Sequence, residues 1–163
     1  MYMLNFNNNE LILTYVGKYD ATAYNFKGKD LITQKELQLS DFRGSYILLD
    51  FWGSWCGPCI AGIPELIEFA TEYKDRIEII SIAFDHDEDL PKLKTIIKEK
   101  EMNWSHIREP KLFSNPAGLN KKFDVKVFPT FILIDKSGNI IYRSTNDVGI
   151  QSIKQFLSKI DDV

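Results

Sequence analysis

The sequence predicts an α/β sandwich in which helices cover a mixed β-sheet. Two continuous apolar runs, residues 46–51 and 77–84, have the length and composition of strands buried on both faces. Each run is followed by apolar residues at helical spacing, and a hairpin and an amphipathic helix come at the end of the chain. This order of elements indicates one sheet with both parallel and antiparallel strands.

Composition narrows the class of protein. The chain has 163 residues, which suits one domain with a substantial core. The net charge of -3, from 20 basic and 23 acidic residues, gives no basic field for nucleic acid. No apolar run approaches the roughly 20 residues that span a bilayer. The first ten residues lack a charged region followed by an apolar one, so we expect no signal peptide in this chain.

Two β-hairpins are expected before the first buried strand. Residues 11–16 follow the turn-like residues 7–9, and Tyr24 and Phe26 alternate with polar residues before residues 27–30, which read as a turn into Leu31 and Ile32. We therefore predict an N-terminal hairpin extension over residues 1–30, packed on a domain of residues 31–163.

Helical spacing predicts the remaining elements. The helix after residue 56 has one apolar face and contains Pro64, which should kink it; this face comprises Ile63, Leu66, Ile67, Ala70 and Tyr73. Asp89 and Pro91 read as the start of a second helix with a solvated lysine face. A short helix is expected from residues 115–116, and a hairpin over residues 130–143. The last helix is indicated by Ile150, Ile153, Phe156, Leu157 and Ile160.

The two cysteines of the chain, Cys56 and Cys59, lie where a buried strand passes into a helix. Unsatisfied N–H groups at a helix start favour an anion, so a Cys-X-X-Cys pair there has an acidic thiol suited to dithiol redox chemistry. Half of a zinc site or two incidental buried thiols are the alternatives. Zinc needs about four ligands, and only His86 and His106 could add nitrogen.

Several motifs together resemble the thioredoxin family. They are Phe51-Trp52, Trp55-Cys56-Gly57-Pro58-Cys59, Pro64 and Phe128-Pro129-Thr130, in the family's order. Residues 39–44 and the extra helix between residues 84 and 129 are similar to the TlpA/ResA-type branch, the thiol-disulfide oxidoreductases of bacterial envelopes. The resemblance implies the thioredoxin fold, a three-layer α/β/α sandwich, with no cofactor or metal besides a redox-active Cys56–Cys59 disulfide.

The resemblance also assigns roles to the two sulfurs. Cys56, nearer the helix start and expected to be the more exposed, attacks the substrate disulfide, and Cys59 resolves the mixed disulfide. Gly57 and Pro58 match the reducing members of the family. A degenerate, redox-inactive module remains the alternative.

Asp50 stands in an otherwise apolar strand, six residues before Cys56. A buried carboxyl group without an ionic partner has a raised pKa, which suits proton transfer near neutrality. The resemblance places it beneath Cys59 in that role; a structural acid paired with a buried lysine is the alternative. Members of the branch often carry a glutamate three residues after the second cysteine, where this chain has Gly62.

Phe128-Pro129-Thr130 resembles the family's cis-proline loop, which faces the cysteines and pairs with an extended substrate segment. An ordinary trans proline at the start of an edge strand is the alternative. Trp55 is expected in an exposed docking surface and Trp52 in the core.

Two other features carry weaker readings. Residues 85–89 could hold a metal ion, but clustered loop charges are more often a solvated helix cap. His106 could act as a base, but a surface or packed histidine is the simpler interpretation.

Two other functions are alternatives to disulfide reduction. A peroxiredoxin-type peroxidase needs threonine or serine and proline where this chain has Gly53 and Leu49. A peptide-binding module would make the cysteines incidental. We therefore predict a monomeric enzyme that reduces disulfides of protein substrates and receives electrons from a donor protein. The resemblance favours the bacterial periplasm or cell envelope, whereas the absence of a visible signal peptide favours the cytoplasm.

Overall fold

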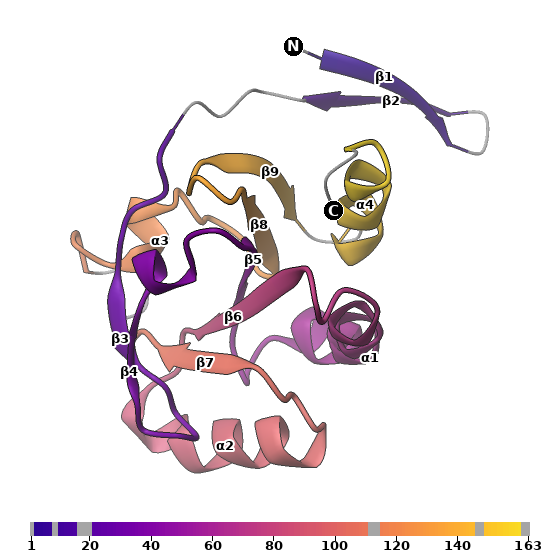
Figure 1. The fold of residues 1–163 in the computed structure, drawn as a ribbon. Coiled ribbons are helices and arrows are strands. Elements are labelled where there is room, and N and C mark those ends of the chain that lie inside the picture. The colour runs from indigo at the N-terminus through magenta and orange to yellow at the C-terminus, as the bar shows by residue number, and fades with distance from the viewer. Residues whose placement is uncertain (1, 8–9, 16–20, 111–114, 146–148, 161–163) are drawn as a thin grey trace.

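A mixed five-stranded sheet forms the centre of the computed structural model, which describes residues 2–7, 10–15, 21–110, 115–145 and 149–160 (Figure 1). Its strands, in the order β7-β6-β5-β8-β9, are β7 (Ser105–Arg108), β6 (Ile77–Ala83), β5 (Tyr46–Trp52), β8 (Thr130–Ile134) and β9 (Ile140–Thr145). The central strand β5 is parallel to β6 and antiparallel to β8. All seven residues of β5 are buried, as its apolar sequence predicts.

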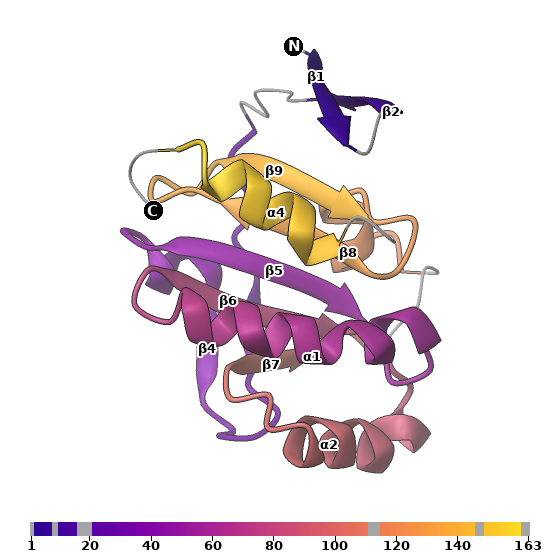
Figure 2. The same ribbon diagram turned by 90° about the vertical axis from the view of Figure 1, so that its right-hand side faces the viewer.

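Helices α1 (Gly57–Glu72) and α4 (Gly149–Leu157) run side by side over one face of this sheet (Figure 2). Their apolar stripes pack on β5 and β8, in a cluster that includes Leu48, Phe69, Leu133 and Ile153. Helix α1 continues through Pro64, and its buried side consists of Cys59, Ile63, Leu66 and Phe69. Helix α2 (Leu90–Glu99) buries Leu93 and Ile97 and leaves its lysines exposed, as predicted.

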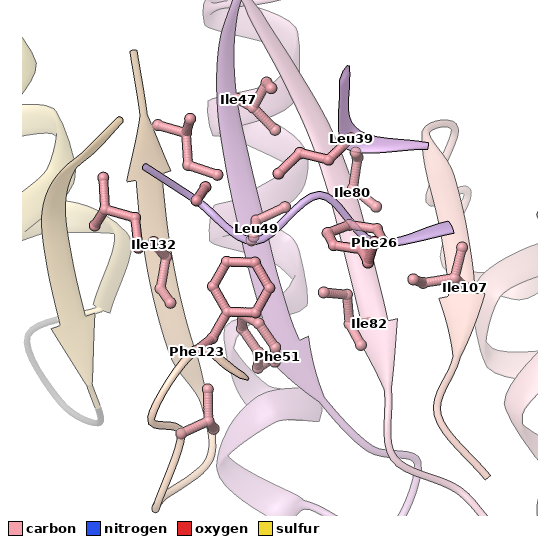
Figure 3. Close-up of a cluster of buried hydrophobic side chains, with 14 of the residues drawn as sticks. Phe26, Leu39, Ile47, Leu49, Phe51, Ile80, Ile82, Ile107, Phe123 and Ile132 are labelled. Atoms are coloured by element: carbon pink, nitrogen blue, oxygen red, sulfur yellow. The ribbon is translucent and has the colours of Figure 1, made fainter. Parts of the chain in front are cut away.

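The opposite face of the sheet is covered by the segment that precedes β5 and by the region of α3 (Leu119–Lys122). Phe26, Leu39 and Phe123 lie over Leu49 and Phe51 of β5 (Figure 3). The helical turns η1 (Leu39–Phe42) and η2 (Asp87–Asp89) complete the fold. The sheet is therefore buried on both faces, which gives the predicted α/β architecture. Within the described ranges, no helix combines the length and apolar character needed to cross a bilayer.

The N-terminal region contains two hairpins, but the second differs from the prediction. Strands β1 (Tyr2–Asn7) and β2 (Glu10–Tyr15) pair with each other as expected. The second hairpin pairs β3 (Lys27–Lys29) with β4 (Glu36–Gln38), so residues 27–29, read as a turn, are a strand. Gly28 lies so close to the Ile107 side chain that an added Cβ would be 2.9 Å from Cγ2. Tertiary contact thus overrides the local turn composition.

Two further elements were missed or displaced. The short edge strand β7 was not expected, and the helix predicted to start at residues 115–116 starts at Leu119. Ala23 and Phe26 belong to the core cluster that contains β5 residues. The division of the chain at residue 30 remains a prediction.

Candidate active site

The two cysteines lie where strand β5 gives way to helix α1. Cys56 is the N-cap residue of α1, and its Sγ accepts a hydrogen bond from the backbone N–H of Cys59 at 3.3 Å. The two residues form a disulfide, with Cα atoms 5.2 Å apart. The first turn of α1 contains no acidic residue, so no side-chain carboxylate there offsets the partial positive charge of the helix N-terminus. A thiolate at this position would be stabilised electrostatically.

The expectation that Cys56 is the more exposed sulfur-bearing residue is not met. The exposed fraction is 5% for Cys56 and 6% for Cys59, because both pack in a cluster with Trp52, Ile63 and Leu93. In the disulfide form, exposure therefore does not distinguish the two cysteines. Their positions relative to the start of α1 distinguish them, because Cys56 is the N-cap residue and Cys59 lies within the first turn.

Asp50 and Cys59 line the same pocket, which has a volume of about 320 Å³. Asp50 projects from β5 beneath the start of α1, and Pro129 and Gly62 also border this space. The sequence predicted that Asp50 and the cysteines come together, and Asp50 and Cys59 both line this pocket. Both residues are also buried, which gives the carboxyl group and the thiol a low-dielectric environment.

Burial raises the pKa of Asp50 to about 7, against the opposing effect of a hydrogen bond from Ser81. The Ser81 Oγ donates to Asp50 Oδ2 at 2.7 Å. Among the described residues, no lysine or arginine forms an ion pair with Asp50 or lines its pocket. The carboxyl group can therefore exchange a proton near neutral pH. Sequence reasoning missed Ser81, although it is the one polar side chain among the apolar residues 79–83.

Gly62, at the position of the family's additional glutamate, borders the pocket without filling it. A Cβ added there would meet no atom within 4 Å. A second acid, Glu65, does line the pocket, so Asp50 is not the only carboxyl group near the sulfurs. The Glu65 side chain, however, accepts a hydrogen bond from Gln151 of α4 at the exposed rim. Asp50 remains the buried acid of the site.

The loop before Cys56 is held by Asp85, which sequence reasoning assigned to a solvated helix cap. The Asp85 side chain is fully buried and accepts hydrogen bonds from the backbone N–H of Ser54, at 3.2 and 3.1 Å, and from its hydroxyl group. Next to it, the Phe84 carbonyl accepts from Trp55 Nε1 at 2.6 Å. Phe84 and Asp85, which directly follow β6, thus fix the backbone that leads into Cys56. Only the tertiary structure reveals that link.

We expect the substitution Asp85→Ala to lower the free energy of unfolding by about 2–3 kcal/mol, because it leaves buried Ser54 donors without an acceptor. Urea unfolding measures the change. Asp87→Ala is the matched control: Asp87 pairs with Arg108 at 2.6 Å, but its side chain is 88% exposed. Exposed pairs contribute about 0–1 kcal/mol. Equal losses in the two variants would contradict the assignment of Asp85.

Trp55 and Phe128, the first residue of the Phe128-Pro129-Thr130 loop, form a surface beside the cysteines, whereas Pro129 and Thr130 are buried. Trp55 is 46% exposed, and its ring packs edge-on against Phe128 with centroids 5.4 Å apart. The Phe128–Pro129 peptide bond is cis, as the resemblance implies. Thr130 is buried, and its hydroxyl donates to the Val127 carbonyl at 2.7 Å. Gly57 and Pro58 are exposed next to this surface, and Trp52 is buried in the core.

Packing decides between the two interpretations of His106. His106 is fully buried, with Nε2 2.9 Å from the Met102 carbonyl oxygen, and burial lowers its pKa. It is the packed histidine. In the described part of the chain, no group of three or more His, Cys, Asp or Glu side chains is placed to hold a metal ion.

Comparison with known proteins agrees with this geometry. Residues 44–140 match the family model described as thioredoxin-like. The chain is 32% identical over 139 residues to the thiol-disulfide oxidoreductase ResA of Bacillus thuringiensis subsp. konkukian, covering 85% of this chain and 76% of that protein.

Two solved structures are similar in fold. A thiol-disulfide oxidoreductase from Bacteroides fragilis has a TM-score of 0.70 and 26% identity, over 84% of this chain and 99% of that one. The exposed lipoprotein thioredoxin of Streptococcus pneumoniae has a TM-score of 0.68 and 25% identity, over 84% of this chain and 100% of that one. The chain therefore belongs to the thioredoxin-like family, as a thiol-disulfide oxidoreductase of the TlpA/ResA-type branch.

Proposed function

We propose that this protein reduces disulfide bonds in protein substrates through its Cys-Gly-Pro-Cys dithiol. The observation that carries the proposal is the position of Cys56 at the N-cap of α1, where its sulfur accepts the Cys59 N–H. Helix N-termini stabilise anions, so the thiolate needed for attack is favoured at Cys56. A second thiol one helical turn away is suited to intramolecular resolution.

The reaction consists of two exchanges. The Cys56 thiolate attacks one sulfur of the substrate disulfide, forms a mixed disulfide and releases the other sulfur as a thiolate. The Cys59 thiol then loses its proton, and its thiolate attacks Cys56 Sγ. This step closes the Cys56–Cys59 disulfide and releases the second substrate thiolate. Two electrons pass from the dithiol to the substrate, whose two thiolates each gain a proton.

Asp50 is the proposed proton carrier of the second exchange. It shares a pocket with Cys59, and its pKa of about 7 lets the carboxylate accept the Cys59 proton and return it near neutral pH. Solvent supplies the remaining proton. This role does not depend on the glutamate that Gly62 replaces.

The proposed substrate surface surrounds the sulfurs. Trp55, Gly57 and Pro58 offer an exposed apolar patch, and the half-buried Phe128 extends it by packing edge-on against Trp55. Pro129 borders the pocket of Cys59, while Thr130 anchors the loop through Val127. An extended segment on either side of a substrate disulfide could pair with the loop backbone and pack on Trp55.

The proposal extends to partners and compartment. Each turnover leaves the protein oxidised, so a donor protein must return two electrons to the Cys56–Cys59 disulfide. We propose that the enzyme acts as a monomer and outside the cytoplasm, in line with the exposed lipoprotein among its structural relatives. Cell fractionation that recovers the protein only from the cytoplasm would overturn the second point.

A single-turnover experiment tests the central proposal. Fully reduced protein is mixed with insulin in excess, and the thiols of both proteins are alkylated and counted by mass spectrometry. We expect one insulin disulfide to be reduced for each Cys56–Cys59 disulfide formed. Binding of insulin with both enzyme thiols retained would identify a peptide-binding module instead.

A further inference from the structure

A row of polar side chains crosses the sheet beneath helix α1. In the strand register, Asp50 of β5 is the neighbour of Ser81 on β6, and Ser81 is the neighbour of His106 on β7. Neighbouring residues in adjacent strands point to the same face of a sheet. Asp50, Ser81 and His106 are all buried. The proposed proton carrier is therefore one member of a buried polar row.

The hydrogen bonds in this row are all donated towards Asp50. Trp104 Nε1 donates to Ser81 Oγ at 2.9 Å, and Ser81 Oγ donates to Asp50 Oδ2 at 2.7 Å. An indole N–H can only donate, so Ser81 must accept from Trp104. The single hydroxyl proton of Ser81 is then free to point at the carboxyl group. This chain of donors favours the ionised form of Asp50.

Trp104 is itself held in place. Its ring stacks on His106, with centroids 5.6 Å apart and an interplanar angle of 29°. His106 is anchored by Met102 and by its backbone N–H, which donates to Asp30 Oδ2 at 2.8 Å. The indole therefore has little freedom to turn away from Ser81.

Few other charged or titratable side chains lie around Asp50. Helix α1 contributes Cys59 and Glu65 to its pocket, β8 contributes the uncharged Phe131, and α4 contributes Gly149 and Ile150. On the β7 side, burial lowers the pKa of His106, which favours its neutral form, and Asp30 lies beyond His106. With Glu65 bound to Gln151 at the rim, Ser81 is the direct polar contact that opposes the effect of burial on Asp50.

We propose that Ser81, oriented by Trp104, is a positioning residue that sets the pH at which Asp50 takes up and releases its proton. The inference deepens the proposed function and rests on the role given there to Asp50. Neither Ser81 nor Trp104 lines the pocket that Asp50 shares with Cys59. Both act through the carboxyl group.

The test is a carboxyl titration of the oxidised protein, in which the cysteines do not titrate. With ¹³C-labelled aspartate, NMR follows the Asp50 carboxyl carbon against pH, and its signal is assigned by its loss in Asp50→Asn. Ser81→Ala removes the hydrogen bond to the carboxylate, so we expect the midpoint to rise by about one pH unit or more. Ser81→Thr keeps the hydroxyl group and should restore the wild-type midpoint.

Two further variants make the test specific. Trp104→Phe should raise the midpoint less than Ser81→Ala, and the double variant should match Ser81→Ala alone, because Trp104 acts through Ser81. If Ser81→Ala does not fold, the test rests on Trp104→Phe. A raised Asp50 midpoint in that variant supports the inference, and an unchanged or lowered midpoint overturns it. The matched control is Ser144→Ala. Ser144 is a buried serine on β9, in register with Phe131, which is itself the β8 neighbour of Asp50. Its hydroxyl group forms hydrogen bonds with Gly149 and Ser152 and not with Asp50.

An unchanged midpoint in Ser81→Ala, or an equal shift in Ser144→Ala, would overturn the inference. The pH profile of disulfide exchange should move in the same direction as the titration. A shifted titration with an unshifted rate profile would uphold the influence of Ser81 on Asp50 and overturn the role of Asp50 in catalysis.

Discussion

Cys56→Ser is expected to abolish disulfide reduction, whereas Cys59→Ser is expected to accumulate a mixed disulfide with its substrate. Without Cys56 no sulfur remains at the N-cap of α1, the position where the thiolate that attacks is stabilised. Without Cys59 the first exchange proceeds, but release then depends on an external thiol. A well-placed internal group can act with an effective concentration of about 10⁵ M, so its loss slows release by many orders of magnitude at millimolar thiol.

Non-reducing electrophoresis and intact mass spectrometry distinguish the two variants. Cys59→Ser should appear as a covalent adduct with insulin that dithiothreitol reverses, and Cys56→Ser should form no such adduct. The double variant is the control for non-covalent binding. Retained turnover in Cys56→Ser, or an adduct through Cys59 in preference to Cys56, would reverse the assigned roles.

Asp50→Asn is expected to change the pH dependence of stability. The folded-state pKa of about 7 lies above the ordinary value of 3.8, so the folded protein favours the neutral acid. Below about pH 4 the Asp50 carboxyl group is protonated in both the folded and the unfolded protein, so its raised pKa does not lower the free energy of unfolding. Between about pH 4 and 7 the unfolded chain releases the proton while the folded protein retains it, so wild-type stability falls as pH rises. The shift corresponds to about 4 kcal/mol above pH 7.

The measurement is urea unfolding of oxidised wild type and Asp50→Asn across this range. The stability of the variant relative to wild type should increase by up to about 4 kcal/mol from pH 4 to pH 8. Glu65→Gln alters an acid at the exposed rim of the same pocket and should show little of this trend. A stability difference between Asp50→Asn and wild type that stays constant with pH would exclude a buried, neutral Asp50.

Local sequence predicted the elements whose composition matches their burial. Strands β5 and β6 are almost entirely apolar, and the buried residues of α1 recur every three to four positions. Strand β7, with the sequence Ser-His-Ile-Arg, lacks such a run and exists because it pairs with β6. Residues 27–29 have turn composition but form a strand, since Gly28 fits against Ile107. Pairing partners of this kind cannot be read from local composition.

The same limit applies to the site. The Cys-X-X-Cys spacing, the lone acid of the first core strand and the proline loop were visible in the sequence, and the structure brings Cys59, Asp50 and Pro129 to one pocket. Ser81 and Asp85 were not identified, because their importance depends on strand register and on a bond to Ser54, 31 residues away. Trp104 gave no local signal at all. These supporting contacts are tertiary properties.

The reduction potential of the Cys56–Cys59 couple tests the central claim most directly. The protein is equilibrated with thiol–disulfide buffers of known potential, and its oxidised fraction is read by alkylation and by the fluorescence of Trp52 and Trp55. A difference of about 30 mV corresponds to roughly 1.4 kcal/mol for a two-electron couple, so the outcomes are well separated. A protein-disulfide reductant should give a value near that of thioredoxin, about −270 mV. A value near about −120 mV, typical of a strong oxidant, would contradict the account and make the protein a disulfide donor.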